Sequence, residues 1–371
     1  MSRLPALQNI PADLVCAEDY ARHARNHLPA DVYEYVVGGG GDELSLRRNR
    51  EALDRLLILP RVLRDLTAGG TQLELCGQRL RHPFLLAPVA FQQLAHPEGE
   101  LATARAAAAL DTTLVVSTLA TRSIEDIAAA GNSQQWFQLY FQHSREFNLS
   151  LIRRAEAAGH QAIMLTVDAP LHGIRNRAQR AGFVLPPGVE AVNLQDRPPL
   201  PRAEFDPQQS IVFQGMMSEA PRWQDVEWLR SQTRLPLILK GVLHPKDVLQ
   251  ARELGCDGVV LSNHGGRTLD CVPSAIEMLP LVRAAVGADY PLLVDGGIQR
   301  GTDAFKAIAL GASAVMVGRP QFWALAVAGA LGVAHLLRVL REELEVAMAL
   351  AGTPTLADIG PSALWKPGQN A

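Results

Sequence analysis

A histidine, two glycines, an arginine and an aspartate lie within the nine residues SNHGGRTLD, at positions 262–270, directly after the apolar run GVVL. The imidazole of His264 can act as a general base if a carboxylate orients it and stabilises its protonated form, and Asp168 is the candidate carboxylate. The guanidinium of Arg267 could bind a substrate carboxylate through two parallel hydrogen bonds. A lone histidine is more often structural, but the neighbouring arginine and glycines favour a functional segment.

Lys240 is a second candidate for chemistry, because it lies at the end of another apolar run. It could form a Schiff base with a carbonyl substrate, as lysines do in some barrel enzymes. It could instead be a fixed cation that stabilises an anionic ring, or it could pair with a carboxylate for structural reasons only. The residue pattern does not separate these three interpretations.

Polar side chains end most of the apolar runs. If the runs are parallel strands of a barrel, their carboxyl ends meet at one face, where barrel enzymes have their active sites. Polar groups are costly to bury without partners, so their convergence predicts a functional site. These residues are Ser117, Gln138, Tyr140, Thr166, Asp168, Lys240, Ser262, His264, Arg267, Asp295 and Arg319.

Glycine-containing loops, DGGIQRG and GRP, follow the last two runs. Loops after the seventh and eighth strands of a barrel commonly bind phosphate through backbone N–H groups and helix N-termini. The candidates are Gly296, Gly297, Gly318 and Arg319. These glycines could also serve only to make tight turns. The segment VVGGGGDEL (36–44) follows no strand pattern and lacks GxGxxG spacing, which argues against a dinucleotide-binding fold.

Eight apolar runs, separated by stretches with helical spacing, predict the elements that position these residues. Continuous rather than alternating apolar runs indicate strands buried on both faces, as in a parallel sheet. The series predicts an α/β fold, a closed (β/α)8 TIM barrel. The runs are 84–90, 114–118, 136–140, 162–168, 236–241, 258–263, 291–296 and 314–318.

Two segments lie outside this regular pattern. Residues 1–80 are expected to form a helical cap and a hairpin, TQLELCGQRL, packed on a barrel formed by residues 81–371. After the fourth strand, the polar, Pro-rich stretch between Asp168 and Pro236 is too long for a simple connection. We interpret it as a lid loop over the site; a linker without a role is the alternative.

The composition excludes several classes of protein. With 371 residues, 48% hydrophobic residues and a net charge of −3, the chain can form a large core and has no basic excess for binding nucleic acid. The four cysteines form no CxxC pair, which favours free thiols over disulfides or a metal site. No signal peptide and no apolar stretch long enough to span a bilayer is recognised. We expect a cytoplasmic protein without a metal or membrane anchor.

Several segments together resemble the FMN-dependent α-hydroxy acid oxidases and dehydrogenases. They are WFQLY, LTVDAP, LPLILKGV, SNHGGRTLD, DGGIQRGTDAFKAIALGA and VGRP, which follow one another along the chain in the order of the family. The resemblance is highly specific and runs from about residue 13 to 355, which implies one FMN hydroxy acid dehydrogenase domain. It also implies FMN as the cofactor and a homotetramer.

The resemblance implies a role for each candidate residue. His264 is expected to be the active-site base with Asp168 as its partner, and Tyr140 to contact the substrate hydroxyl. Arg175, Arg267 and Tyr35 are expected to bind the substrate carboxylate. Lys240 is expected beside the flavin, where it would stabilise the reduced anion. Further FMN contacts are implied for Pro88, Val89, Ala90, Ser117, Gln138, Thr166, Ser262, Asp295, Gly296, Gly297, Gln299, Gly318 and Arg319.

Three positions depart from the family pattern. Gln299 stands where the family usually has Arg, so one phosphate contact becomes neutral, and compensation by Arg300 stays open. Leu119 stands where glycolate oxidase carries Trp, which argues against glycolate as the preferred substrate. His172 stands where a small or apolar residue often lines the pocket; an exposed loop residue is the alternative interpretation.

The resemblance predicts oxidation of an L-2-hydroxy acid, with L-lactate favoured, to the 2-keto acid while O2 is reduced to H2O2. Mandelate-type or long-chain hydroxy acids are alternative substrates, and a quinone or protein is the alternative electron acceptor. A Schiff-base lyase that uses Lys240 is the alternative from a different class. A flavin-binding protein without activity is not favoured, because Arg175, His264 and Arg267 are all present.

Overall fold

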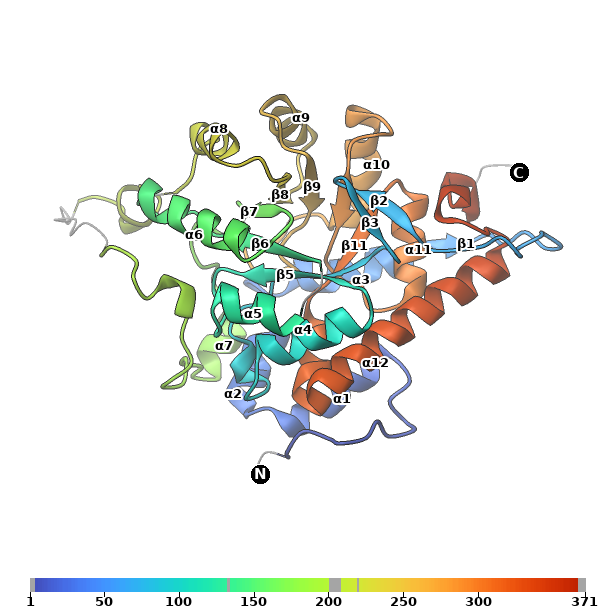
Figure 1. The fold of residues 1–371 in the computed structure, drawn as a ribbon, viewed down its shortest axis with the longest axis horizontal. Helices are drawn as coiled ribbons and strands as arrows, with labels where there is room; N and C mark the ends of the chain where they lie inside the picture. The colour runs from blue at the N-terminus through green and yellow to red at the C-terminus, as the bar shows by residue number, and fades with distance from the viewer. Residues whose placement is uncertain (1–3, 132–133, 200–207, 219, 366–371) are drawn as a thin grey trace.

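Eight parallel strands close into a barrel in the computed structural model, which describes residues 4–131, 134–199, 208–218 and 220–365. The strand order is β10-β11-β4-β5-β6-β7-β8-β9, so strands adjacent in sequence are adjacent in the barrel. Helices surround the strands (Figure 1), which confirms the predicted (β/α)8 TIM barrel. The strands are β4 (Phe84–Leu86), β5 (Thr113–Ser117), β6 (Gln135–Leu139), β7 (Ile163–Thr166), β8 (Leu237–Val242), β9 (Gly258–Leu261), β10 (Leu292–Val294) and β11 (Ala314–Val317).

A hairpin closes the amino-terminal end of the barrel. Its strands, β2 (Leu73–Leu75) and β3 (Gln78–Leu80), pair antiparallel, as the segment TQLELCGQRL predicts. Their buried leucines belong to the same apolar cluster as the barrel-interior side chains, including Trp136. The indole Nε1 of Trp136 also donates to Gln78 Oε1 at 2.9 Å. The opposite end, where the strands finish, is therefore the open one.

The helices outside the barrel pack against the outward-facing side chains of the strands. They are α4 (Glu100–Ala109), α5 (Ile124–Gly131), α6 (Arg145–Ala157), α8 (Trp223–Gln232), α9 (Pro245–Glu253), α10 (Ala275–Val286), α11 (Gly301–Ala309) and α12 (Arg319–Ala351). The long helix α12 is interrupted at Ala328 and Gly329, where the backbone is not helical.

Helix α12 corrects one expectation from the sequence. By length and composition it could span a membrane, whereas no such stretch was expected. However, 67% of its most apolar 18-residue window is buried inside the molecule, and the helix packs against α1, α4 and α11. Its apolar character is therefore accounted for by the core of the protein.

Of the remaining elements, α2, α3 and the lid lie at the open end of the barrel. Helix α1 (Ala17–His27) packs on α12, while α2 (Ala30–Val37) and α3 (Leu44–Asp54) contact the loops that follow the strands. The short strands β1 (Leu57–Ile58) and β12 (Leu364–Trp365) pair antiparallel. The predicted lid contains α7 (Asn176–Arg180), a 3-10 turn (Val192–Leu194) and a π-helical turn (Ile211–Met216). Residues 200–207 and 219 of that lid lie outside the described residues.

Candidate active site

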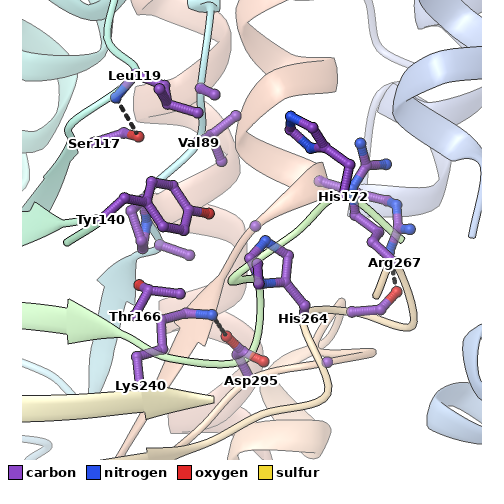
Figure 2. A pocket seen from close by; sticks show the side chains of 18 of the residues that line it. Val89, Ser117, Leu119, Tyr140, Thr166, His172, Lys240, His264, Arg267 and Asp295 are labelled. Atoms are coloured by element: carbon purple, nitrogen blue, oxygen red, sulfur yellow. Dashed lines mark hydrogen bonds and ion pairs between the residues drawn. The ribbon is translucent and has the colours of Figure 1, made fainter. Parts of the chain in front are cut away.

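A cavity of about 740 Å³ lies at the carboxyl ends of the barrel strands, within the size range of cofactor and ligand pockets. Most of the predicted site residues line it (Figure 2). They are Tyr35, Pro88, Val89, Ala90, Ser117, Tyr140, Thr166, Arg175, Lys240, His264, Arg267, Asp295, Gly296, Gly297, Gln299, Gly318 and Arg319. The other three, Gln138, Asp168 and Ser262, each lie within hydrogen-bonding distance of a residue that lines the cavity.

His264, which lines the cavity, forms a titratable pair with Asp168 behind it. His264 Nδ1 lies 2.9 Å from Asp168 Oδ1. Burial alone would raise the pKa of Asp168, but the charge of His264, their hydrogen bond and the charge of Lys240 together lower it. Asp168 therefore remains a carboxylate that can orient the imidazole and stabilise its protonated form.

The backbone of His264 is in the left-handed region, with φ of 57°, which is uncommon for a residue other than glycine. Its N–H donates to Ser262 Oγ at 2.9 Å, and the following Gly266 N–H donates to the carbonyl of Asn263 at 2.9 Å. These bonds hold the tight turn at the end of β9. Such backbone strain is common where a turn aims a functional side chain.

Two arginines that line the cavity lie near the same aromatic ring. The guanidinium carbons of Arg267 and Arg175 lie 5.0 Å and 5.7 Å from the centroid of the Tyr35 ring. Arg267 Nη1 also donates to the carbonyls of Tyr35, Val36 and Gly38 at 2.9–3.1 Å. Burial, and then the charge of Arg175, lower the pKa of Arg267 to about 10, so it stays protonated at neutral pH. Two half-buried cations that have no carboxylate partner among the described residues form a site for an anion.

Lys240 keeps its charge inside the barrel. Its Nζ lies 3.1 Å from Asp295 Oδ2 and donates to Ser262 Oγ at 3.2 Å. Burial disfavours the ammonium form, but the charges of Asp295 and Asp168 outweigh burial and raise the pKa of Lys240. Schiff-base formation needs a neutral amine, so this arrangement favours a fixed cation over the lyase alternative.

Tyr140 faces His264 across the cavity in Figure 2. Burial raises the pKa of its phenol to about 12. The phenol is therefore protonated at neutral pH and can donate a hydrogen bond to a ligand.

Unpaired buried atoms test whether the residues fit FMN. Gln138 Nε2, Thr166 Oγ1 and Asp295 Oδ1 are buried and have no hydrogen-bond partner within the described part of the chain. Buried polar atoms are normally paired, so these three indicate a polar ligand. At the start of α12, a Cβ placed on Gly318 would meet nothing closer than 4.0 Å. This space at a helix N-terminus suits a phosphate, and the set as a whole fits FMN.

Arg319, which was expected to bind the phosphate of FMN, directs its guanidinium at backbone carbonyl groups instead. Arg319 lines the cavity, but its guanidinium donates to the carbonyls of Val36, Gly265 and Gly38 at 2.9–3.0 Å. Burial, and then the charge of Arg267, lower the pKa of Arg319 to about 9. An anion here would stabilise its charge.

Arg300 does not replace the positive charge that is missing at Gln299. The guanidinium of Arg300 pairs with Glu343 of α12 at 2.9 Å, and Arg300 is absent from the described residues that line the cavity. Arg50 of α3, which sequence reasoning missed, does line the cavity and donates to the carbonyl of Gly297 at 2.9 Å. Its charge is balanced by Asp303 at 2.7 Å.

The lid supplies the cavity residues that the sequence gave no means to identify. Arg197 Nη1 donates to Gln142 Oε1 at 3.3 Å, which links the lid to the loop after β6. This segment has no periodic pattern from which side-chain directions could be deduced. Beyond α7, the lid residues that line the cavity are Leu194, Arg197, Gly215, Met216, Ala220 and Pro221.

Leu119 and His172 also line the cavity. His172 is exposed to solvent at the same time, so it belongs to the mouth of the cavity. Burial, and then the charge of Arg175, lower its pKa below the ordinary value. Both interpretations of His172, as a pocket residue and as an exposed loop residue, therefore hold in part.

Comparison with known proteins agrees with this geometry. The family described as FMN-dependent dehydrogenase matches residues 24–366. An L-lactate oxidase of Alicycliphilus denitrificans is 52% identical over 94% of this chain and 96% of its own length. A 4-hydroxymandelate oxidase of Amycolatopsis orientalis is 46% identical over 91% of this chain and 94% of its own. A crystal structure of mandelate oxidase with (S)-2-phenylpropionate superimposes with a TM-score of 0.85 at 44% identity, covering 95% and 98% of the two chains. The chain therefore belongs to the FMN-dependent dehydrogenase family.

Proposed function

We propose that this protein is an FMN-dependent oxidase of L-2-hydroxy acids, with L-lactate as its favoured substrate. The observation that carries the proposal is the convergence of a carboxylate-supported imidazole, His264 with Asp168, and the two-arginine site in one cavity. The 52% identity to a protein named L-lactate oxidase supports the choice of substrate.

The residues of the cavity have separate roles in the oxidation. Arg175 and Arg267 bind the substrate carboxylate, which fixes the orientation of the carbon that is oxidised. A 2-hydroxy acid loses two protons and two electrons when it becomes a 2-keto acid; His264 takes a proton, and Asp168 stabilises the resulting imidazolium. When bound, FMN supplies the two-electron acceptor. Lys240 adds a fixed positive charge, which favours the negative charge of the reduced cofactor.

An apolar wall supports a small aliphatic substrate. Leu119 and Val89 line the cavity on the side facing His172 in Figure 2. A lactate methyl group would contact this wall without leaving a polar group unpaired. Mandelate is the competing substrate, because a mandelate oxidase has a closely similar structure.

The test is turnover under air with L-lactate, D-lactate, glycolate and (S)-mandelate, with H2O2 and keto acid both quantified. We expect L-lactate to give the highest kcat/KM and one H2O2 for each pyruvate. Turnover that requires an added quinone would show a dehydrogenase, and a higher kcat/KM for mandelate would replace the proposed substrate. Borohydride trapping of Lys240 with substrate would support the lyase alternative instead.

We further propose that the protein is a cytoplasmic homotetramer. Each chain has a single FMN domain of about residues 13–355, and residues 1–80 pack on the barrel. Exposed apolar side chains that include Val62, Leu63 and Leu350 support an association between copies. Light scattering on the purified, FMN-loaded protein would measure the assembly, and a monomer would contradict the proposal.

A further inference from the structure

A glycine-rich turn, Gly38–Gly41, joins α2 to α3 and has no role in the function proposed so far. It lies between the two loops that carry the substrate-binding arginines. Gly40 N–H donates to the carbonyl of Gly266 at 2.7 Å, and Gly41 N–H donates to the carbonyl of Ile174 at 2.8 Å. Gly266 and Ile174 are the residues that directly precede Arg267 and Arg175. Two successive N–H groups of the turn therefore hold the backbone next to each arginine.

The contact between these segments leaves no room for side chains. A Cβ on Gly40 would lie 2.6 Å from the carbonyl oxygen of Thr268, and a Cβ on Gly39 would lie 2.9 Å from that of Gly266. The two arginine loops also meet each other, because a Cβ on Gly173 would lie 2.5 Å from the carbonyl oxygen of Thr268. Glycine is required here by close backbone approach.

Asp270, the last residue of SNHGGRTLD, binds the backbone that directly follows the same turn. Its carboxylate accepts the backbone N–H groups of Asp42, Leu44 and Ser45 at 3.0, 3.2 and 2.8 Å. Burial would raise the pKa of Asp270, but these hydrogen bonds lower it, so the group is ionised at neutral pH. An anion at the start of α3 also interacts favourably with the helix dipole.

We propose that the Gly38–Gly41 turn and Asp270 are positioning residues that set the spacing between Arg175 and Arg267. The assignment rests on the proposed function, since the two arginines bind the carboxylate of a 2-hydroxy acid. Neither the turn nor Asp270 needs to touch the substrate. The two loops leave different strands, β7 and β9, and the turn links them from the outside. A displacement of about 1 Å in such an arrangement can cost about a hundredfold in rate.

The first test is Gly40→Ala in the FMN-loaded protein, with pyruvate as the probe. The added methyl group must displace the loop at Thr268, so the two arginines separate. The dissociation constant of pyruvate, read from the change in flavin absorbance, should rise about ten- to a hundredfold, and kcat/KM for L-lactate should fall by a similar factor. The affinity for FMN should stay close to that of the wild type. Gly360→Ala is the matched control, because a Cβ there meets no described atom within 4 Å.

The second test is Asp270→Ala, which does not depend on whether the Gly40 variant folds. It should also weaken pyruvate binding, and Asp270→Asn should restore part of the affinity because its amide oxygen still accepts hydrogen bonds. Asp19→Ala is the control. The carboxylate of Asp19, in the first turn of α1, accepts the backbone N–H groups of Val15 and Cys16 at 2.9 Å. Its loss should lower Tm without changing the affinity for pyruvate.

Unchanged pyruvate affinity in folded Gly40→Ala and Asp270→Ala, with an active wild type, would overturn the positioning role and leave the proposed function intact. A wild-type protein that neither binds pyruvate nor oxidises any 2-hydroxy acid would overturn the proposed function, and this assignment with it.

Discussion

Lys240 carries a positive charge inside the barrel because neighbouring carboxylates balance it. Its side chain is almost fully buried, and the carboxylates of Asp295 and Asp168 supply the compensating charge. Asp295 Oδ1 has no hydrogen-bond partner within the described residues, so one side of this ion pair is free to bind a ligand. We therefore propose that the pair both holds the lysine and binds part of FMN.

Lys240→Met should weaken the stabilisation of negative charge on bound FMN. We expect a lower affinity for sulfite and less of the anionic one-electron-reduced flavin in a dithionite titration, because the fixed cation is removed. Lys306→Met is the control, because the Lys306 ammonium donates to the carbonyl of Leu53 and does not line the cavity. Equal sulfite affinity in the Lys240→Met protein and the wild type would argue against the assigned role.

The sequence predicted which residue types lie at the site better than it predicted where individual side chains point. Polar side chains at strand ends must face the open end of a barrel, so the sequence placed His264, Lys240 and Asp295 together. The direction of Arg300 was not predictable, because its partner Glu343 is brought near by the packing of α12. Arg50 was missed because its helix approaches the cavity from outside the barrel.

At the scale of elements, apolar runs predicted all eight barrel strands, but some of their ends were wrong. The first run was expected to span 84–90, whereas β4 ends at Leu86. Pro88 has no N–H group to donate to a neighbouring strand, so the ladder stops there and the chain turns along the cavity. The π-helical turn Ile211–Met216 was not predicted, because its apolar residues have neither strand nor helix periodicity.

The first half of the lid is anchored to the outer helices by one buried side chain. Asn193 Oδ1 accepts from the N–H of Ile124 at 3.1 Å and from Arg154 Nη2 at 3.0 Å, and its Nδ2 donates to the carbonyl of Arg122 at 3.2 Å. Its neighbour Leu194 lines the cavity. The anchor therefore holds a wall of the active site in place.

Asn193→Ala should release this anchor and raise KM for L-lactate more than it lowers kcat. Leaving the buried partner groups unpaired costs about 1–3 kcal/mol, so limited proteolysis within residues 190–222 should also become faster. Gln195→Ala is the control on the same segment, since Gln195 is exposed and bonds only to Glu190 among the described side chains. Equal KM and cleavage rates in the two variants would contradict an anchoring role.

At the scale of the whole molecule, barrel closure places residues from distant parts of the chain around one cavity. Asp168 and His264 are 96 positions apart in sequence and follow β7 and β9, which are separated by β8 in the barrel, yet they lie within hydrogen-bonding distance. Barrel closure follows from the repeated strand–helix pattern and was predictable. The pairing of β1 with β12 was not, because strands of two residues carry no pattern.

Two buried histidines predict how stability depends on pH. Burial lowers the pKa of His82 and of His160 to about 4, against an ordinary value of 6.5. The unfolded chain therefore binds more protons than the folded one between pH 6.5 and 4. Stability should be fully present above pH 6.5 and fall as pH drops through this window, by up to about 1.4 kcal/mol per pH unit for each histidine.

Urea denaturation between pH 7.5 and 5 would measure this slope. His160→Leu keeps a side chain of similar bulk and cannot be protonated, so it should flatten the dependence. A slope that is identical in the wild type and the variant would show that His160 does not contribute.

The most direct test of the account is anaerobic reduction of bound FMN by L-lactate, followed by stopped-flow absorbance in the wild type and in His264→Asn. Asparagine tolerates the left-handed backbone at this position, so the turn should be kept. We predict that both proteins bind FMN, that L-lactate but not D-lactate reduces it in the wild type, and that the variant is slower by about 10²–10⁴-fold. Flavin reduction at the wild-type rate in His264→Asn, or a wild-type protein that does not bind FMN, would contradict the account.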